Sequence, residues 1–400
     1  MIKEFISNKN FNNYYFGRNI SNIGDIFHDV ALTIIVSSYT NSIFISGVLV
    51  SINAIVRVLS SLFLIKIIDK LNPKKSMIKL NMLYGFFVLI LFLLIVFKFN
   101  YFYLFIFEII FSFIFSIYKI VREKILKSIL PSSNKSKYMS FIYTSENTLS
   151  VLVPIISVLL LKFISLRYFI LINSISFFVS AYYTTRIVID MGNRGKVKNE
   201  NTNYDFKYIT QIYPYLILIF IIAAVITFIS STSKIIILQF IKEFNFDSKK
   251  VGVLQSIFAV GCILGSFIPG MFKDNSIIKN LKKFIFICIA IFIPYILYQS
   301  FYTFVIVDFC YGLIFTAINV FLQVYYQSTI KEEHFGFIRS IHTIVVGAII
   351  PLSMFISGYL LNLWTLKILF LIFSVIILSL LVVFYILEVC YEENYFAKGE

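Results

Sequence analysis

Charged residues are scarce in this chain of 400 residues: they make up 14% of the sequence, while 59% is hydrophobic and the mean hydropathy is +0.89. So few charges cannot give a soluble globule its polar surface. Apolar runs of about 20 residues recur between short polar breaks, which is the length that a helix needs to cross about 30 Å of hydrocarbon. The short alternating segments of a membrane β-barrel are lacking. We therefore expect an all-α integral membrane protein.

Cysteine and recognisable catalytic motifs are also sparse. The four cysteines have no ligand-like spacing, so we expect packing residues rather than disulfides or a metal site, and no cofactor. A GxxxxGK[ST] phosphate loop is missing from the sequence, which argues against a self-contained ATP-driven pump. Residues 1–13 lack the apolar region and cleavage site of a signal peptide, so the first helix is expected to act as the insertion signal.

The apolar runs predict twelve transmembrane helices in two bundles of six. The expected domains are an N-terminal bundle (1–189), a cytoplasmic linker (190–213), a C-terminal bundle (214–390) and a cytoplasmic tail (391–400). The expected helices span about 14–38, 43–67, 77–98, 101–119, 139–161, 166–185, 214–241, 250–272, 284–299, 303–326, 340–362 and 364–388.

A short basic turn, IIDKLNPKK at residues 67–75, connects the second and third expected helices. Cytoplasmic loops accumulate Lys and Arg, so this turn orients the chain with both termini in the cytoplasm. Most of the 35 Lys and Arg then face the inner leaflet, where anionic headgroups attract them. The formal charge of +15 is explained by the membrane, and nucleic-acid binding is not expected.

The two halves show signs of duplication. Asp69 ends the second expected helix and Asp274 the eighth, 205 positions later, while Pro154 in the fifth helix and Pro351 in the eleventh are 197 positions apart. A duplicated six-helix unit leaves repeats at such a spacing. We expect both prolines to bend their helices.

Several stretches resemble the major facilitator superfamily, and within it the exporters of macrolide and enterobactin type. They are GRNISNIGDIFHDVALTIIV from Gly17, the loop IIDKLNPKKSMI, GVLQSIFAVGCILGSF from Gly252 and PLSMFISGYLLN from Pro351. The chain departs from the family pattern at Ile65, Lys70 and Asn72, where the loop signature has Gly, Arg and Gly. The fifth helix keeps only Pro154 of the Gly-Pro-rich motif that antiporters often carry.

The resemblance implies a monomeric two-bundle transporter of the bacterial plasma membrane, with a cavity that opens alternately to each side. Its expected function is proton-coupled efflux of an amphipathic small molecule, such as a macrolide, a peptide or a siderophore. The expected partners are this substrate, protons and the lipid bilayer. The inner loops would form a conformational latch, made by Asp69, Lys70, Lys74, Lys75 and Asp274.

Charges at bilayer depth are costly and point to partners or function. Asp25, His28 and Asp29 lie three or four positions apart in the first helix, and Arg57 lies in the second. Asp25 and Arg57 are equally far from the outer turn, so we expect them to form an ion pair. This pair could lock the two helices permanently, or a proton on Asp25 could loosen it during transport.

Four further charged residues lie within the spans: Glu108, Glu146, Lys234 and Asp308. Glu108 and Lys234 are expected at similar depth near the outer ends of their helices, where they could form a gate, although Lys234 could instead reach the outer headgroups. Either Glu146 or Asp308 could carry the coupling proton if it occupies an apolar pocket. His342 is expected at the inner start of the eleventh helix.

Other function classes stay open from sequence alone. An importer or facilitator would use the same fold. A membrane-embedded enzyme would need a polar cluster at the interface, and the loops offer only His334 with Glu332 and Glu333, a set too generic to indicate chemistry. A sensor on the transporter fold would be expected to carry a sizeable extra domain. We therefore expect a transporter rather than an enzyme.

Overall fold

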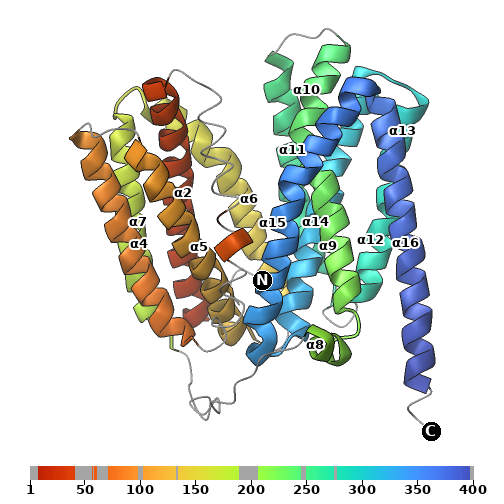
Figure 1. The fold of residues 1–400 in the computed structure, drawn as a ribbon, viewed down its shortest axis with the longest axis horizontal. Helices are drawn as coiled ribbons and strands as arrows, with labels where there is room; N and C mark the ends of the chain where they lie inside the picture. The colour runs from red at the N-terminus through yellow and green to blue at the C-terminus, as the bar shows by residue number, and fades with distance from the viewer. Residues whose placement is uncertain are drawn as a thin grey trace. The chain divides into compact units, whose positions relative to one another are not determined.

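The computed structural model describes residues 8–40, 56, 58–60, 71–97, 102–131, 134–188, 206–244, 249–273 and 277–396. Every regular element in these ranges is a helix, so the expected all-α class is confirmed (Figure 1). Seven segments of the described residues are long and apolar enough to cross a membrane. The helices are α2 (Lys9–Thr40), α4 (Pro73–Val96), α5 (Phe102–Ile129), α6 (Lys135–Leu160), α7 (Leu166–Thr185), α8 (Phe206–Ile212), α9 (Leu216–Ser230), α10 (Ser233–Glu243), α11 (Lys249–Phe267), η2 (Ile268–Met271), α12 (Ile277–Ile291), α13 (Ile293–Leu297), α14 (Phe301–Thr329), α15 (Glu332–Leu363) and α16 (Leu366–Phe396).

Two helices are longer than hydropathy predicts. The helix α5 continues to Ile129, past its expected end near residue 119, and α15 begins at Glu332 rather than near residue 340. His342 therefore lies well inside α15 and not at its start. Apolar length measures the hydrocarbon thickness, whereas Lys, Arg and Glu are good helix formers that extend a helix beyond it. The expected second helix, 43–67, lies largely outside the described residues.

Two of the expected helices are interrupted. The seventh divides into α9 and α10 at Ser231 and Thr232, whose hydroxyl groups donate to the carbonyl oxygens of Thr227 and Ile229 at 2.8 and 2.6 Å. Such side-chain bonds compete with the helical ladder. The ninth divides into α12 and α13 just before Pro294, which lacks the N–H that would continue the helix.

The chain forms two compact units, each with segments from both halves of the sequence. Unit 1 comprises Met1–Pro131, Thr148–Asn203 and Lys331–Gly347, and unit 2 comprises Ser132–Asn147, Tyr204–Ile330 and Ala348–Glu400. In unit 1, α7 packs against both α2 and α4, and α5 packs against the same two helices. In unit 2, α14 is central and contacts α9, α11, α12 and α13.

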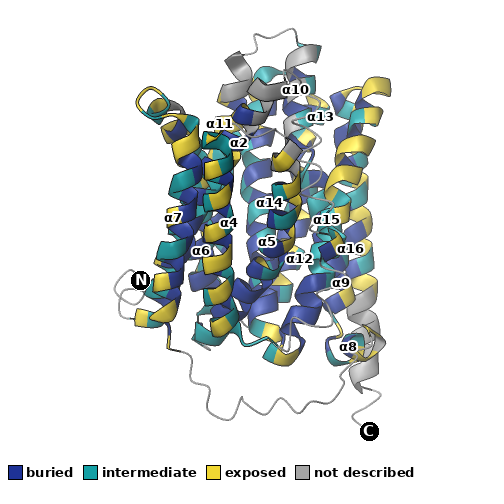
Figure 2. Ribbon diagram, turned by 60° about the vertical axis from the view of Figure 1, so that its left-hand side comes forward, coloured by how far each residue is buried: buried dark blue, intermediate teal, exposed yellow. Residues whose placement is uncertain are grey.

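Each peripheral helix has one buried face and one exposed apolar face (Figure 2). In α4, Tyr84, Val88 and Leu91 are buried, while Phe86 and Ile90 are 55% and 45% exposed. Large apolar side chains on an outer face suit a lipid environment, where they need no protein partner. This burial pattern fits a multi-pass membrane protein.

Glycines bring α11 and α14 of unit 2 into backbone contact. A Cβ atom on Gly261 or Gly265 would overlap the backbone oxygen of Phe309 or Leu313, and one on Gly312 would overlap that of Phe258. Small residues permit this close approach between membrane helices, and the gain is van der Waals packing.

A buried ion pair joins α15 to α5 within unit 1. Arg339 and Glu123 are in direct contact, and they are only 4% and 6% exposed. Two charges removed from water must satisfy one another, and loss of one partner leaves the other uncompensated. The pair therefore fixes the first half of α15, residues 332–347, against α5.

Replacing Gly265 should destabilise unit 2. We expect Gly265→Ala to lower the stability by about 1–3 kcal/mol, because the added methyl group meets backbone that cannot rotate away. Gly358→Ala is the matched control, since no atom lies within 4 Å of its added Cβ. Thermal unfolding of the purified protein in detergent tests this, and equal melting temperatures for the two variants would contradict the packing argument.

Breaking the buried ion pair should loosen the first half of α15. Arg339→Met is expected to cost about 3–5 kcal/mol because Glu123 stays buried without this partner. Adding Glu123→Leu should recover much of the loss. Hydrogen exchange of residues 335–347 measures the effect. Lys331→Met is the control, because its 4.0 Å contact with Glu333 is exposed and contributes little; if the control loosens α15 equally, the pair has no special role.

Candidate functional site

A polar stripe runs along α2 toward α5. Arg18, Ser21, Asp25 and His28 are three or four positions apart, so they share one helix face. Arg18, Ser21 and His28 are buried, with 5%, 0% and 5% exposure, and Asp25 is half-buried. A membrane helix that buries three polar side chains on one face needs matching groups on its neighbour.

The helix α5 supplies those groups at the same helical spacing. The Nε2 atom of His28 lies 3.4 Å from Oε1 of Glu108, and Glu108 is 4% exposed. About two turns before His28 in α2, the hydroxyl group of Ser21 lies 3.2 Å from that of Tyr118. The rings of Phe111 and His28 meet edge-on with their centroids 5.7 Å apart, so Phe111 shields the contact between His28 and Glu108 from water.

The helix α7 approaches the same face of α2 at Gly24. A Cβ atom at this position would lie 2.6 Å from Oδ1 of Asn173 and would also overlap the hydroxyl group of Ser176, so only glycine fits. Asp25, next in the chain, lies beside the Asn173 side chain. The hydroxyl group of Ser176 donates to Oδ1 of Asn173 at 3.3 Å, so the Asn173 side chain is close to both Ser176 and Asp25.

Asp25 and Asp29 differ from His28 in exposure. His28 is buried toward α5, whereas Asp29, one position later, is exposed and Asp25 is half-buried. The expected partner of Asp25, Arg57, lies outside the described residues, so that ion pair stays a prediction. Among the described residues, the charges near Asp25 are those of Asp29, His28 and Arg122.

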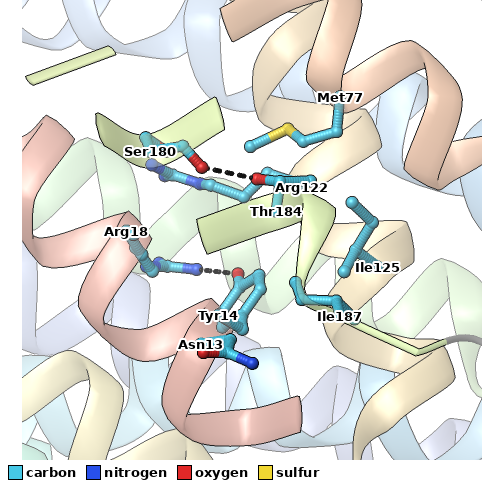
Figure 3. A pocket seen from close by; sticks show the side chains of 10 residues that line it. Asn13, Tyr14, Arg18, Met77, Arg122, Ile125, Ser180, Thr184 and Ile187 are labelled. Carbon is cyan, nitrogen blue, oxygen red and sulfur yellow. Dashed lines mark hydrogen bonds between the residues drawn. The ribbon is translucent and has the colours of Figure 1, made fainter. Parts of the chain in front are cut away.

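The end of the stripe near the start of α2 is basic instead. A small recess lies between α2, α4, α5 and α7, and it is lined by two buried arginines, Arg18 and Arg122 (Figure 3). Arg18 donates to the hydroxyl group of Tyr14 at 2.6 Å, and Arg122 stacks over the Tyr118 ring at 5.3 Å. Along α2 and α5 the buried charges therefore change from the pair of His28 and Glu108 to the arginines Arg18 and Arg122, with Glu123 next to Arg122 in α5.

The remaining buried acids belong to unit 2. Asp308 on α14 is 3% exposed, and its Oδ2 atom has no hydrogen-bond partner among the described residues. Glu146 on α6 is half-buried. Lys234 belongs to α10, but its side chain is outside the description, so the gate expected with Glu108 stays a prediction. In unit 1, Glu108 is buried against His28.

The latch and bending residues are described only in part. Asp69, Lys70 and Asp274 lie outside the described residues. Asn72 caps α4 by accepting from the backbone N–H of Lys75 at 3.0 Å, Pro73 occupies the first helical position, and Lys74 follows it. Pro154 and Pro351 lie inside α6 and α15.

The described residues contain no group of three or more His, Cys, Asp or Glu side chains that could hold a metal ion. Sequence reasoning identified Asp25, His28 and Glu108 but missed the residues that position them: Arg18, Ser21, Gly24, Tyr118, Arg122 and Asn173. The spacing of polar residues in α2 was the available signal, since period 3.6 places Arg18 and Ser21 on the face of Asp25.

Comparison with known proteins places the chain in a family. The model of the Major Facilitator Superfamily matches residues 14–326. No curated protein matches the sequence. Solved structures with the same fold include an outward-facing bacterial homologue of the iron transporter ferroportin, with 16% identity, a TM-score of 0.77, and coverage of 94% of this chain and 98% of that one.

Two further structures are similar over the same share of the chain. The human organic anion transporter MFSD10 has 10% identity, a TM-score of 0.72 and coverage of 94% of this chain and 99% of that one. The transporter FucP in its outward conformation has 10% identity, a TM-score of 0.66 and coverage of 94% and 98%. The family model extends over most of the described helices, and the fold agrees with it. The chain is a transporter that belongs to the Major Facilitator Superfamily.

Proposed function

We propose that this transporter is an exporter that uses the inward flow of protons to expel an amphipathic small molecule. The observation that carries the proposal is the buried contact between His28 and Glu108 in unit 1. The proposed setting is a bacterial plasma membrane, with both termini in the cytoplasm and the protein acting as a monomer.

The electrostatics of α2 and α5 favour a proton as the coupling ion. Asp25, Asp29 and Glu108 bring three carboxyl groups near one imidazole, and the hydrocarbon penalises each uncompensated charge. A proton neutralises a carboxylate without requiring space for another side chain. His28 uses Nε2 toward Glu108, so its second ring nitrogen can exchange a proton as well.

The surroundings of the pair support a change of state on protonation. Phe111, Tyr84, Phe177 and Tyr118 form a buried aromatic cluster next to His28 and Glu108. Rings that exclude water strengthen the attraction between the two side chains. Loss of this attraction on protonation of Glu108 would release α5 from α2. The amphipathic substrate is supported by the resemblance of the first helix and the 67–75 loop to macrolide exporters.

A second candidate is a transporter of a divalent metal ion. The Asn173 side chain is close to both Asp25 and Ser176, and carboxylate, amide and hydroxyl oxygens are the donor type that hard cations prefer. One similar structure is a homologue of an iron transporter. Such a site would rely on amide and hydroxyl oxygens beside a single carboxylate.

Removing the titratable group of Glu108 should uncouple export. In everted vesicles, we expect Glu108→Gln to reduce proton-driven export of a macrolide or ethidium by about tenfold or more, since a charge-assisted hydrogen bond contributes about 1.5–3 kcal/mol. The recovery of the fluorescence of a quenched pH-sensitive dye on substrate addition measures the coupled proton movement out of the acidified vesicles. Glu333→Gln, at an exposed site, should leave export unchanged.

A proton uncoupler separates the two candidates. Cells with the protein should lose resistance to the exported compound when the uncoupler collapses the gradient, and resistance that persists would refute proton coupling. The metal candidate predicts a different result. Cells with the protein should then gain tolerance to iron or manganese, and Asn173→Ala should remove this tolerance. Their sensitivity to macrolides and ethidium should equal that of cells without the protein.

A further inference from the structure

Asp308 is a buried acid that the His28 and Glu108 contact leaves unexplained. It lies in α14, the central helix of unit 2, and only 3% of it is exposed. Its Oδ2 atom lacks a hydrogen-bond partner among the described residues. An ionised carboxylate in such a place is costly, so it requires a neutralising charge.

The duplicated sequence relates Asp308 to Glu108. The two acids are 200 positions apart, close to the spacing of the other repeated features, and each belongs to the fourth expected helix of its half. His28 of the first helix has its counterpart near Thr232, 204 positions later, at the break between α9 and α10.

The contacts repeat in the same way as the positions. In unit 1, α2 meets α5 through His28 and Glu108. In unit 2, α9 meets α14 where the hydroxyl group of Tyr311 donates to the carbonyl oxygen of Ile229, and Thr232 lies beside the same tyrosine. Tyr311 is one turn from Asp308, so the repeated contact lies one turn from the acid.

Among the described side chains of unit 2, no base faces Asp308 as His28 faces Glu108. The titratable groups that face Asp308 in the described residues are Cys262 of α11 and Tyr311 of α14, and Cys288 of α12 faces Tyr311. The helix α9 has no ionisable side chain. A neutral thiol or phenol cannot balance a carboxylate, and where unit 1 has an imidazole unit 2 has a threonine.

We propose that Asp308 is a second exchangeable proton site, the C-terminal counterpart of Glu108, and that one transport cycle moves two protons. An O–H bond forms on the Asp308 carboxylate when a proton enters from the outer side and breaks when the proton leaves to the inner side. The stoichiometry rests on the proposed proton-coupled export, whereas the proton on Asp308 does not.

Infrared spectroscopy of the full-length protein in lipid nanodiscs tests the site without a substrate. At neutral pH we expect the C=O stretch of a protonated carboxyl group, which shifts to lower frequency in D2O. This band should be lost in Asp308→Asn and kept in Glu108→Gln. Asp308→Glu should move the band rather than remove it, and it serves as the test if the Asn variant fails to fold.

The outcomes separate this proposal from the proposed function. A band that persists in Asp308→Asn, or that does not shift in D2O, overturns the proton site. If no compound is exported but the band behaves as expected, the proposed function fails and the site stands. Where ethidium is exported, the protons moved per ethidium should fall twofold in Asp308→Asn, and an unchanged ratio overturns the stoichiometry.

Discussion

The contact between His28 and Glu108 determines how the buried part of unit 1 is arranged. A carboxylate in hydrocarbon needs a partner, and the imidazole 3.4 Å away supplies it from the neighbouring helix. Once α2 and α5 meet at this level, helical spacing aligns Ser21 with Tyr118. The arginines Arg18 and Arg122 then line the recess further along the same two helices. One pairing therefore sets the register of a complete polar stripe.

Close backbone packing is the second requirement. In water, burial of apolar surface holds helices together. Lipid is as apolar as leucine, so the helices of a membrane protein are held together by close van der Waals packing instead. Gly24 lets α7 reach α2, and Gly261 and Gly265 let α11 reach α14. In unit 1 this approach places Asn173 beside Asp25. The glycines thus position polar side chains as well as backbones.

Hydropathy was sufficient to predict the helical class and most of the helices, because the hydrocarbon thickness imposes a length on every span. It failed at the end of α5 and the start of α15, where charged helix formers continue the helix beyond the apolar run. The face shared by Asp25 and His28 with Arg18 was predictable from spacing. The partner of His28 was not, because Glu108 is 80 positions away and only packing brings the two together.

The glycine packing and the lone acid of unit 2 have a common cause. Gly312 is one turn after Asp308, and a Cβ on it would lie 3.3 Å from the sulfur of Cys262, so the space between α11 and α14 is already filled. A Lys, Arg or His side chain that could balance Asp308 would push these backbones apart and lose the contacts that hold unit 2. A proton adds a charge and almost no volume. A proton is therefore the counter-charge that fits where helices pack this closely. The close packing that stabilises α11 and α14 thus favours the protonated form of Asp308 over the carboxylate.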